Sequence, residues 1–460
     1  MAGASLVGTT IEFYDFFIYG TAAALVFGPL FFPALGESAG TVASFATFGV
    51  AFFFRPLGAI FFGHLGDRLG RKKTLVATLT IMGVSTAAIG VVPTAATWGW
   101  VAPVLLVVLR AAQGVAVGGE WAGAALLTAE YAPAHKRGFY GMFPQLGAGI
   151  AMALSGGTFL AASLTLSPAD FASWGWRIPF LLSGVLLMVG LYIRLKIEET
   201  PAFTATRDRD EIVKLPIVEA VRFEWRRMLL AGGALTMSFG FFYVVSVYLT
   251  SYAGNAPGVG VLGLTRTTVL VGGSFAGLLL CATVVASARA ADTFGRKRVV
   301  LVGTVASIFA GPLAFLVMEP GNTASFVVGI AVLVVPFGIP YGCAATLLPE
   351  LFRTKYRYTG AGMGYNLAGI LGGAIPLIIA PSLTQAYGGM GVGMYLAALG
   401  VISSACVLAI PETQHVDICD DAPRAAPADA VRPVDTFVEG VRRGDMFASP
   451  VAAETARRTR

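Results

Sequence analysis

Long apolar runs separated by short polar segments make up most of this 460-residue chain. A helix needs about 20 apolar residues to cross the hydrocarbon core of a bilayer. Twelve runs are of this kind, with expected boundaries at 5–32, 41–62, 74–92, 101–127, 138–163, 177–195, 228–252, 267–287, 299–318, 325–348, 359–381 and 392–410. Membrane β-barrels need short alternating segments instead. The pattern therefore predicts an all-α membrane protein with twelve transmembrane helices.

The composition agrees with a chain that lies in a membrane. Hydrophobic residues make up 56% and charged residues 13% of the sequence, whereas a soluble domain has about 25% charged residues. The first apolar run is too long for a cleavable signal peptide and carries acids. It has no basic flank, which raises the question of whether the natural chain begins further upstream. The cysteines lack metal or redox spacing and are expected to be free thiols: Cys281, Cys343, Cys406 and Cys419.

One basic motif occurs twice, at an offset of about half the chain. Its first copy covers residues 63–75 and its second copy covers 288–300. Two membrane-embedded halves with the same internal motif are typical of a secondary transporter. The recurring residues are Asp67, Gly70, Arg71 and Lys72 in the first copy and Asp292, Gly295, Arg296 and Lys297 in the second.

We predict that these loops pair with neighbouring helix ends and lock one conformation of the transporter. A weaker repeat with the same internal spacing lies at 130–137 and 350–357. The alternative is that the basic residues only anchor the loops at the membrane surface. Besides the recurring residues, the predicted gating residues are Gly63, Arg68, Glu130, Arg137, Glu350 and Arg357.

The polar segments divide the chain into four regions. We expect a six-helix bundle at 1–195, a cytoplasmic linker with a short amphipathic helix at 196–227, a second six-helix bundle at 228–410 and a disordered tail at 411–460. Prolines in the tail argue against a long helix or coiled coil there.

The basic residues are distributed unevenly between the two sides of this topology. Nearly all of the 32 Lys and Arg residues fall in the even-numbered loops, the linker and the tail, whereas Arg177 and Arg266 lie on the opposite side. The positive-inside rule then places both termini in the cytoplasm of a multi-pass protein of the cell (inner or plasma) membrane. Orientation thus accounts for the formal charge of +6, and we expect no nucleic-acid partner.

Ionisable residues inside apolar runs are costly, which makes them functional candidates. Away from the ends of the runs, the first half contains five of them: Glu12, Asp15, Arg55, Arg110 and Glu120. The runs of the second half contain none. Their polar residues are uncharged at neutral pH: Tyr243, Tyr248, Tyr341, Tyr365 and Asn366.

The spacing of Glu12, Asp15 and Tyr19 places the three side chains on one helix face. Arg110 lies at a similar depth in its own run, so we expect it to contact Asp15 or Glu12 across a central cavity. Three acids against two arginines leave one carboxylate unpaired, and burial favours the protonated form of such a group. The alternative is a salt-bridge network that only fixes helix packing, and for Glu120 we favour a structural or gating role.

Motifs for other kinds of chemistry are absent from the sequence. It has no Walker A loop, nucleophile elbow or zinc spacing, and the glycines at 258–263 that match a dinucleotide fingerprint follow no strand. The three histidines, His64, His135 and His415, fall in cytoplasmic segments. We therefore expect no enzyme activity, metal or cofactor, and a proton gradient as the energy source.

These residues resemble a known family. The segments 63–75 and 288–300 resemble the signature loops of the major facilitator superfamily, and Arg110-Ala-Ala-Gln113-Gly114 resembles its helix-4 motif. The resemblance covers about residues 5–412 and implies two six-helix bundles that work by alternating access. Motifs that resemble the metabolite:proton symporter branch are Glu12-Phe-Tyr-Asp15-Phe, Phe54-Arg55-Pro56-Leu57-Gly58, Gly118-Gly119-Glu120-Trp121, Trp174-Gly-Trp-Arg177, Glu198-Glu-Thr-Pro201 and Tyr356-Arg357-Tyr358.

That branch imports small organic acids such as shikimate and 2-oxoglutarate, or osmolytes such as proline and betaine. The resemblance implies proton-coupled uptake, with Glu12, Asp15 and Arg110 in proton coupling. An organic acid is favoured because several segments look nearer to shikimate permeases, while an osmolyte symporter and a non-transporting metabolite sensor stay open as alternatives. The expected partners are a small-molecule substrate, protons and the lipid bilayer, and we expect a monomer. Candidates for substrate binding are Tyr19, Arg55, Arg110, Gln113, Glu120, Tyr243, Tyr341 and Asn366.

Overall fold

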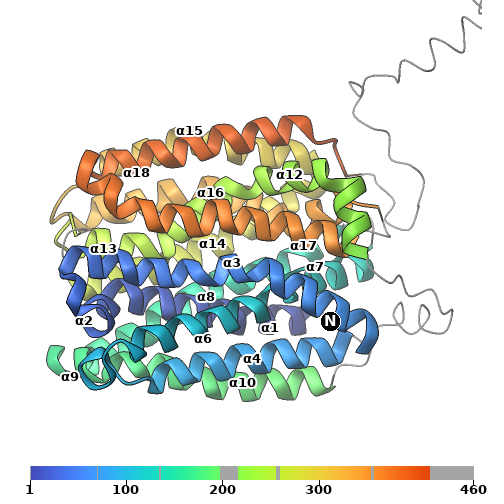
Figure 1. Ribbon diagram of the computed structural model, residues 1–460. Helices are drawn as coiled ribbons and strands as arrows, with labels where there is room; N and C mark the ends of the chain where they lie inside the picture. Colours follow the sequence, from blue (N-terminus) through green and yellow to red (C-terminus); the bar gives the residue numbers. More distant parts are fainter. Residues whose placement is uncertain are drawn as a thin grey trace, which may run out of the picture. The chain divides into compact units, whose positions relative to one another are not determined.

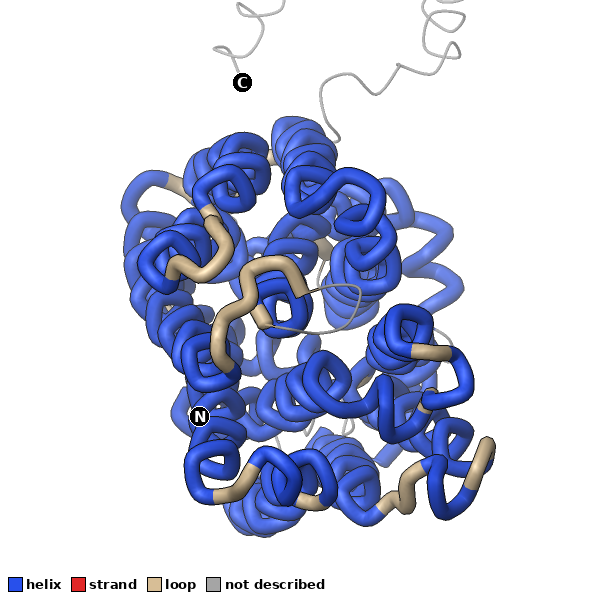
Figure 2. The backbone as a smooth tube through the Cα atoms, turned by 90° about the vertical axis from the view of Figure 1, so that its left-hand side faces the viewer, coloured by secondary structure: helices blue, strands red, loops and turns tan. Residues whose placement is uncertain are grey.

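The computed structural model describes residues 2–69, 71–133, 136–196, 216–254, 260–353 and 357–414. The chain divides into two compact units, Met1–Asp421 and Ala422–Arg460, and all described residues belong to the first. Long helices lie alongside one another in this unit (Figure 1). Viewed along their axes, the described segments are helices joined by short loops, without a strand among them (Figure 2).

The first half of the unit begins with a helix that changes its winding. A π-helical turn interrupts it where the backbone passes from α1 to α2, and such turns occur frequently at functional sites. The helices of this half are α1 (Ala2–Ala22), η1 (Ala23–Phe27), α2 (Gly28–Phe31), η2 (Pro33–Leu35), α3 (Glu37–Leu69), α4 (Arg71–Val91), α5 (Ala95–Trp98), α6 (Val101–Gly118), α7 (Glu120–Tyr131), α8 (Arg137–Thr165), α9 (Pro168–Ser173), η4 (Gly175–Arg177) and α10 (Ile178–Lys196).

The second half repeats the interruption in its first helix, where the π-helix η5 follows α12. This helix begins at Pro216, so the predicted start at 228 is wrong, and the helix extends into the segment predicted as a linker. The helices are α12 (Pro216–Tyr243), η5 (Val244–Tyr248), α13 (Leu249–Ala253), α14 (Arg266–Phe294), α15 (Arg296–Val317), α16 (Thr323–Leu351), α17 (Arg357–Ala368), η7 (Gly369–Ala374) and α18 (Ile375–Ala409).

Eleven helical segments of the described residues are long and apolar enough to cross a membrane. The prediction of twelve differs because the last two expected helices form one helical run, Arg357–Ala409. This run is kinked at Gly388, whose φ of 66° is readily adopted only by glycine. The two arms on either side of the kink correspond to the eleventh and twelfth predicted helices, and the all-α membrane fold is confirmed.

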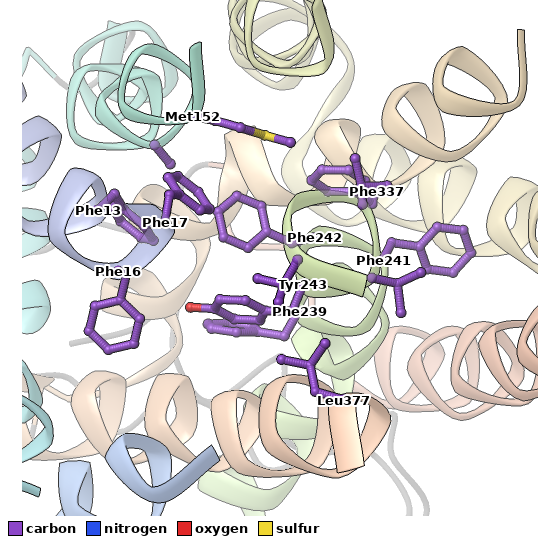
Figure 3. Close-up of a cluster of buried hydrophobic side chains, with 14 of the residues drawn as sticks. Phe13, Phe16, Phe17, Met152, Phe239, Phe241, Phe242, Tyr243, Phe337 and Leu377 are labelled. Carbon is purple, nitrogen blue, oxygen red and sulfur yellow. The ribbon is translucent and has the colours of Figure 1, made fainter. Parts of the chain in front are cut away.

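The two halves meet along two seams. On one seam α8 lies against α14, and on the other α3 lies beside η7 and α18. Glycines allow the backbones to approach on the first seam, since a Cβ on Gly149 would lie 2.8 Å from the carbonyl oxygen of Gly277. The inner faces of α1 and α12 fill the space between the seams with aromatic rings (Figure 3).

The repeated motif occupies tighter junctions than the predicted loops. The second copy contains only Gly295 between α14 and α15, with a φ of 97°. The backbone of the first copy belongs to the end of α3 and the start of α4. Several predicted positions lie outside the described side chains: Gly63, Asp67, Arg68, Gly70, Arg71, Lys72 and Glu130. Most of the predicted linker, the tail beyond residue 414 and Cys419 also lie outside the described residues.

Candidate functional site

The five ionisable residues predicted inside the membrane are all buried. Their exposed fractions do not exceed 4%: Glu12, Asp15, Arg55, Arg110 and Glu120. They come from four helices of the first half, namely α1, α3, α6 and α7. Charges at such depth need compensation from protein groups or a ligand, so their partners define what the site can do.

Asp15 ends a relay of hydrogen bonds that begins at Arg110. The carboxylate accepts from the hydroxyl of Thr86 in α4 at Oδ2 (2.7 Å) and from the hydroxyl of Ser183 in α10 at Oδ1 (2.5 Å). Gln113 Nε2 donates to Thr86 Oγ1 at 2.7 Å, and Arg110 Nη1 donates to Gln113 Oε1 at 2.7 Å. All five side chains are 0% exposed, so the relay is sealed from solvent.

The expected direct contact of Arg110 with Asp15 or Glu12 is wrong, because two neutral side chains stand between Arg110 and Asp15. Within the described residues Arg110 forms no ion pair, and its Nη2 donates instead to the carbonyl of Phe48 at 3.2 Å. Aromatic rings hold the guanidinium in place, with Tyr19 at 4.1 Å, Phe16 at 4.6 Å and Phe48 at 4.8 Å from Cζ. Arg110 is therefore committed to a fixed structural setting.

Arg55 has a different setting. Its guanidinium lies 4.6 Å from the ring of Phe16 and 4.5 Å from the ring of Phe52. Its Nε, like that of Arg110, is buried without a hydrogen-bond partner, and it forms no ion pair with any residue that the structure describes. Unlike Arg110, it is not held by a described glutamine or backbone carbonyl. The hydroxyl of Tyr243 is its polar neighbour. Arg55 is thus a buried cation with aromatic faces and no anion in contact, which is the setting of an anion-binding group.

Glycines bring the helices of the two arginines together. A Cβ on Gly114 would collide with the carbonyl oxygen of Ala51, and one on Gly118 with that of Arg55. On the α3 side, a Cβ on Gly58 would collide with the carbonyl oxygen of Val115. Gly114 and Gly118, at four-residue spacing on α6, therefore set the approach of α3 to α6, and with it the position of Arg55.

The two glutamates of the cluster differ in their partners. Glu120 pairs with Arg194 of α10, which itself donates to the carbonyl of Leu75. Glu12 forms no hydrogen bond or ion pair within the described part of the chain, although Arg55, Arg194 and Glu120 all lie within electrostatic range. Glu12 is therefore the unpaired acid of the cluster, whereas Glu120 is held within the first half.

The second half faces this cluster with aromatic rings. In Figure 3 the rings of Phe239, Phe242 and Tyr243 in α12 lie opposite Phe13 and Phe17 in α1. Phe242 lies 5.4 Å from Phe17 between ring centroids. Among the described residues of this half, the buried tyrosine hydroxyls of Tyr243, Tyr341 and Tyr365 form no close hydrogen bond. Tyr243 lies beside Arg55, and Tyr341 and Tyr365 lie beside each other. The second half thus contributes hydroxyl groups to the site and no charge.

Trp121 and Tyr365 close the cluster toward the end that carries the basic motif. Their rings stack at 3.6 Å with an interplanar angle of 8°. Gln145 links the same region across the halves, because it accepts from Trp121 Nε1 and donates to the carbonyl of Tyr341 at 2.7 Å. Asn366 donates to the carbonyl of Gly118 at 3.4 Å, so it takes part in this closure.

At the basic-motif end, Asp292 joins the two halves. Its carboxylate accepts from the backbone nitrogens of Gly138 (2.8 Å) and Phe139 (2.9 Å) at the start of α8. It also pairs with Arg296 at 3.1 Å. An anion at a helix N-terminus interacts favourably with the helix dipole, so Asp292 holds α8 of the first half against α14 of the second.

Further residues, most of them from the second half, brace this junction. Arg296 Nε lies 3.5 Å from Glu350 Oε2, which accepts from the Thr413 hydroxyl at 2.6 Å. Glu412 accepts from the backbone nitrogens of Arg296 and Lys297 at the start of α15. Arg357 Nε donates to the carbonyl of Pro349 at 3.2 Å, and Arg137 is buried at the start of α8.

A cavity of about 530 Å³ lies at the opposite end of the molecule. Residues of both halves line it, including Glu37 and Thr41 from α3 and Thr250 and Arg266 from the second half. Between this cavity and the central cluster, the Ser251 hydroxyl donates to the carbonyl of Ala24 at 3.1 Å. Contacts between the halves thus lie on both sides of the buried charges.

Sequence reasoning missed several residues of the site. Thr86 and Ser183 bind Asp15, and Trp121 and Gln145 join the halves, but none of them is charged. A hydroxyl in an apolar helix commonly bonds its own backbone, so the sequence carries no signal that selects these two. Trp121 was visible only as part of a motif.

Comparison with known proteins agrees with this architecture. The profile of the family described as "Sugar (and other) transporter" matches residues 1–214 and 259–420. Among solved structures, the xylose transporter XylE from E. coli in a partially occluded inward open conformation superposes with a TM-score of 0.71 at 17% identity, covering 90% of this chain and 98% of that one. This likeness concerns the fold.

Comparison of sequences finds relatives with higher identity than these solved structures. The "Inner membrane metabolite transport protein YhjE" of Escherichia coli K12 is 42% identical over 417 residues, covering 90% of this chain and 94% of the relative. The "Shikimate transporter" of the same organism is 38% identical (89% and 94% covered), and its "Proline/betaine transporter" is 33% identical (92% and 85% covered). These relatives confirm the resemblance to the metabolite:proton symporter branch. The chain belongs to the sugar (and other) transporter family of the major facilitator superfamily, whose members are membrane transporters and not enzymes.

Proposed function

We propose that the protein is a proton-coupled symporter that imports a small organic acid. The observation that carries this proposal is Arg55, a buried guanidinium with no anion in contact. A substrate carboxylate beside Arg55 would supply the missing charge through charge-assisted hydrogen bonds. The buried hydroxyls of Tyr243, Tyr341 and Tyr365, which form no close hydrogen bond within the described residues, would donate to the remaining oxygens of the substrate.

Asp15 carries the proton in this proposal. It is sealed from solvent and faces only neutral donors, Thr86 and Ser183, so it has no partner that fixes its charge. Arg110 acts on Asp15 electrostatically and through Gln113, without contacting the carboxylate. Glu12 is the second candidate for the proton because it lacks a partner.

A quaternary ammonium substrate such as betaine fits the site less well. Recognition of such a group uses free aromatic faces. Here the guanidinium groups of Arg55 and Arg110 lie over Phe16, Phe48 and Phe52. The shikimate and proline/betaine relatives are named for different ligands. Because arginines cover these aromatic faces, the site favours the organic acid over betaine.

A zwitterionic amino acid such as proline is the second candidate, and Glu12 favours it. The unpaired carboxylate of Glu12 lies near the guanidinium of Arg55. Glu12 could therefore bind the ammonium group of the substrate, and Arg55 its carboxylate. Transport of proline would assign Glu12 to substrate binding and leave Asp15 as the proton carrier.

The proposal includes a location in the inner or plasma membrane, with the Asp292 junction and both termini in the cytoplasm. The excess of Lys and Arg at the basic-motif end supports this orientation. The cavity at the opposite end then opens toward the outside, and the chain works as a monomer.

Uptake into proteoliposomes with an imposed inward proton gradient tests the proposal. Labelled shikimate, 2-oxoglutarate and proline are compared with and without a protonophore, and Asp15→Asn serves as the coupling variant. We expect protonophore-sensitive accumulation of an acid, and in the variant exchange of substrate without accumulation. Accumulation of proline alone would favour the second candidate, and undiminished accumulation by Asp15→Asn would contradict the proton role.

A further inference from the structure

The relay between Arg110 and Asp15 has a fixed direction. Arg110 has only hydrogen-bond donors, so Gln113 must turn Oε1 toward it and Nε2 toward Thr86. Thr86 Oγ1 therefore accepts one hydrogen bond. Its own proton has two acceptors in reach, Asp15 Oδ2 at 2.7 Å and the carbonyl of Met82 at 2.9 Å.

These two acceptors match the two protonation states of the carboxyl group. An ionised Asp15 accepts only, so Thr86 donates to it. A protonated Asp15 carries a new O–H bond at Oδ2, which donates to Thr86 Oγ1, while Thr86 turns its own proton to Met82. The added proton comes from water and returns to water in the conformations of alternating access that open the site, since Asp15 is sealed in this one. No other covalent bond forms or breaks.

Ser183 does not offer the same alternative. Its hydroxyl donates to Asp15 Oδ1, and within the described residues it has no second acceptor. If Oδ1 were protonated, its proton would meet the hydroxyl hydrogen of Ser183, and that hydrogen has no other acceptor to which it could turn. Oδ2 is the oxygen that can bind a proton without leaving a buried donor unpaired.

We propose that Thr86 is the positioning residue of the proton step, and that its hydroxyl switches between Asp15 and Met82 as Oδ2 gains and loses a proton. This inference rests on the proposed function, in which Asp15 carries the proton. Helix α8 contributes the uncharged Thr158 next to Tyr14. The other charged or titratable groups around Asp15 are Tyr14 and Glu12 on its own helix, Arg110 on α6 and Glu120 on α7, with Arg55 on α3 and Arg194 on α10 beyond Glu12.

The pH dependence of gradient-driven uptake tests the role of Thr86. In Thr86→Val the ionised carboxylate loses a charge-assisted hydrogen bond, and the protonated form loses a weaker neutral one. The pH at which uptake falls to half should therefore rise by roughly 0.5–1 unit. Thr86→Ser keeps the hydroxyl and should restore the wild-type profile, whereas a purely structural role would leave the profile in place and lower only the amount of inserted protein.

The outcomes separate this inference from the function on which it rests. If Asp15→Asn abolishes accumulation but Thr86→Val retains the wild-type pH profile, the switch at Thr86 is wrong and the proton role of Asp15 stands. If Asp15→Asn accumulates substrate normally, the proposed function fails and the switch fails with it. If Thr86→Val is not inserted, Thr86→Ala is measured against the same expectation.

Discussion

In the first half of the molecule, charged side chains lie in the middle of helices that cross the membrane, whereas the facing surface of the second half presents rings and tyrosine hydroxyls. The buried charges of the second half, such as Arg296 and Glu350, lie at the ends of its helices. Two halves with the same sequence motif thus carry their charge at different depths.

The difference in depth corresponds to two roles of the buried charges, ligand binding and attachment of one helix to another. A charge in the middle of the membrane can bind a substrate ion or a proton, which are the roles proposed for Arg55 and Asp15. A charge at a helix end can hold another helix by its terminus, as Asp292 holds α8. Substitutions that change ligand binding without changing helix attachment, or the reverse, test this comparison.

The largest effect is expected from removing the charge of Arg55. Loss of one partner of a buried charge pair costs about 2–5 kcal/mol, so Arg55→Gln should raise the KM for an acidic substrate by roughly 30- to 4,000-fold. Uptake kinetics in proteoliposomes measure this. Arg55→Lys, which keeps the charge, should recover part of the affinity. An unchanged KM in Arg55→Gln would remove Arg55 from the substrate site.

A smaller effect is expected from filling the close contact that positions Arg55. A Cβ at Gly118 would collide with the carbonyl of Arg55, so Gly118→Ala should destabilise the protein by about 1–3 kcal/mol. Gly157→Ala is the matched control, because nothing lies within 4 Å of a Cβ there. Thermal unfolding in detergent compares them, and equal melting temperatures would show that α3 and α6 can separate without loss.

The sequence predicted the fold because a bilayer leaves few alternatives. Only continuous apolar runs can cross it as helices, so the spans were visible before any contact was known. The errors arose where polar residues continue a helix, as in the start of α12 at Pro216, and where a helix run bends, as at Gly388.

The candidate site could be predicted only in part. Charges inside apolar runs stand out, which is why Asp15, Arg55 and Arg110 were found. Their partners do not stand out, because Thr86 and Ser183 resemble many hydroxyl residues in membrane helices. The predicted contact between Asp15 and Arg110 failed because charge pairing alone cannot foresee that Gln113 and Thr86 intervene.

A still smaller effect is expected from removing the charge of Asp292, which binds the N-terminus of α8. Asp292→Asn removes the charge at the N-terminus of α8, a contact worth about 1–2 kcal/mol, so the junction should open more often. Hydrogen exchange of the Gly138 and Phe139 amides should then be faster by about 5- to 30-fold.

Glu412→Gln is the control for the junction between the halves. Glu412 accepts from backbone nitrogens of α15 in the same way, but both partners belong to the second half. This variant should therefore loosen the start of α15 and leave α8 protected. Equal protection of α8 in wild type and Asp292→Asn would mean that Asp292 does not hold the two halves together.

The smallest effect is expected from a single hydroxyl of the second half. Within the described residues the Tyr243 hydroxyl forms no close hydrogen bond, although it lies beside Arg55. Tyr243→Phe should therefore change the melting temperature little, while loss of a bond to substrate worth about 0.5–1.5 kcal/mol should raise KM by about 2- to 12-fold. Tyr248 is the matched case, because its hydroxyl bonds Thr384 and the carbonyl of Ala380. Tyr248→Phe should lower stability and spare KM. If both variants lower stability alone, the hydroxyls of the second half pack the protein and do not bind the substrate.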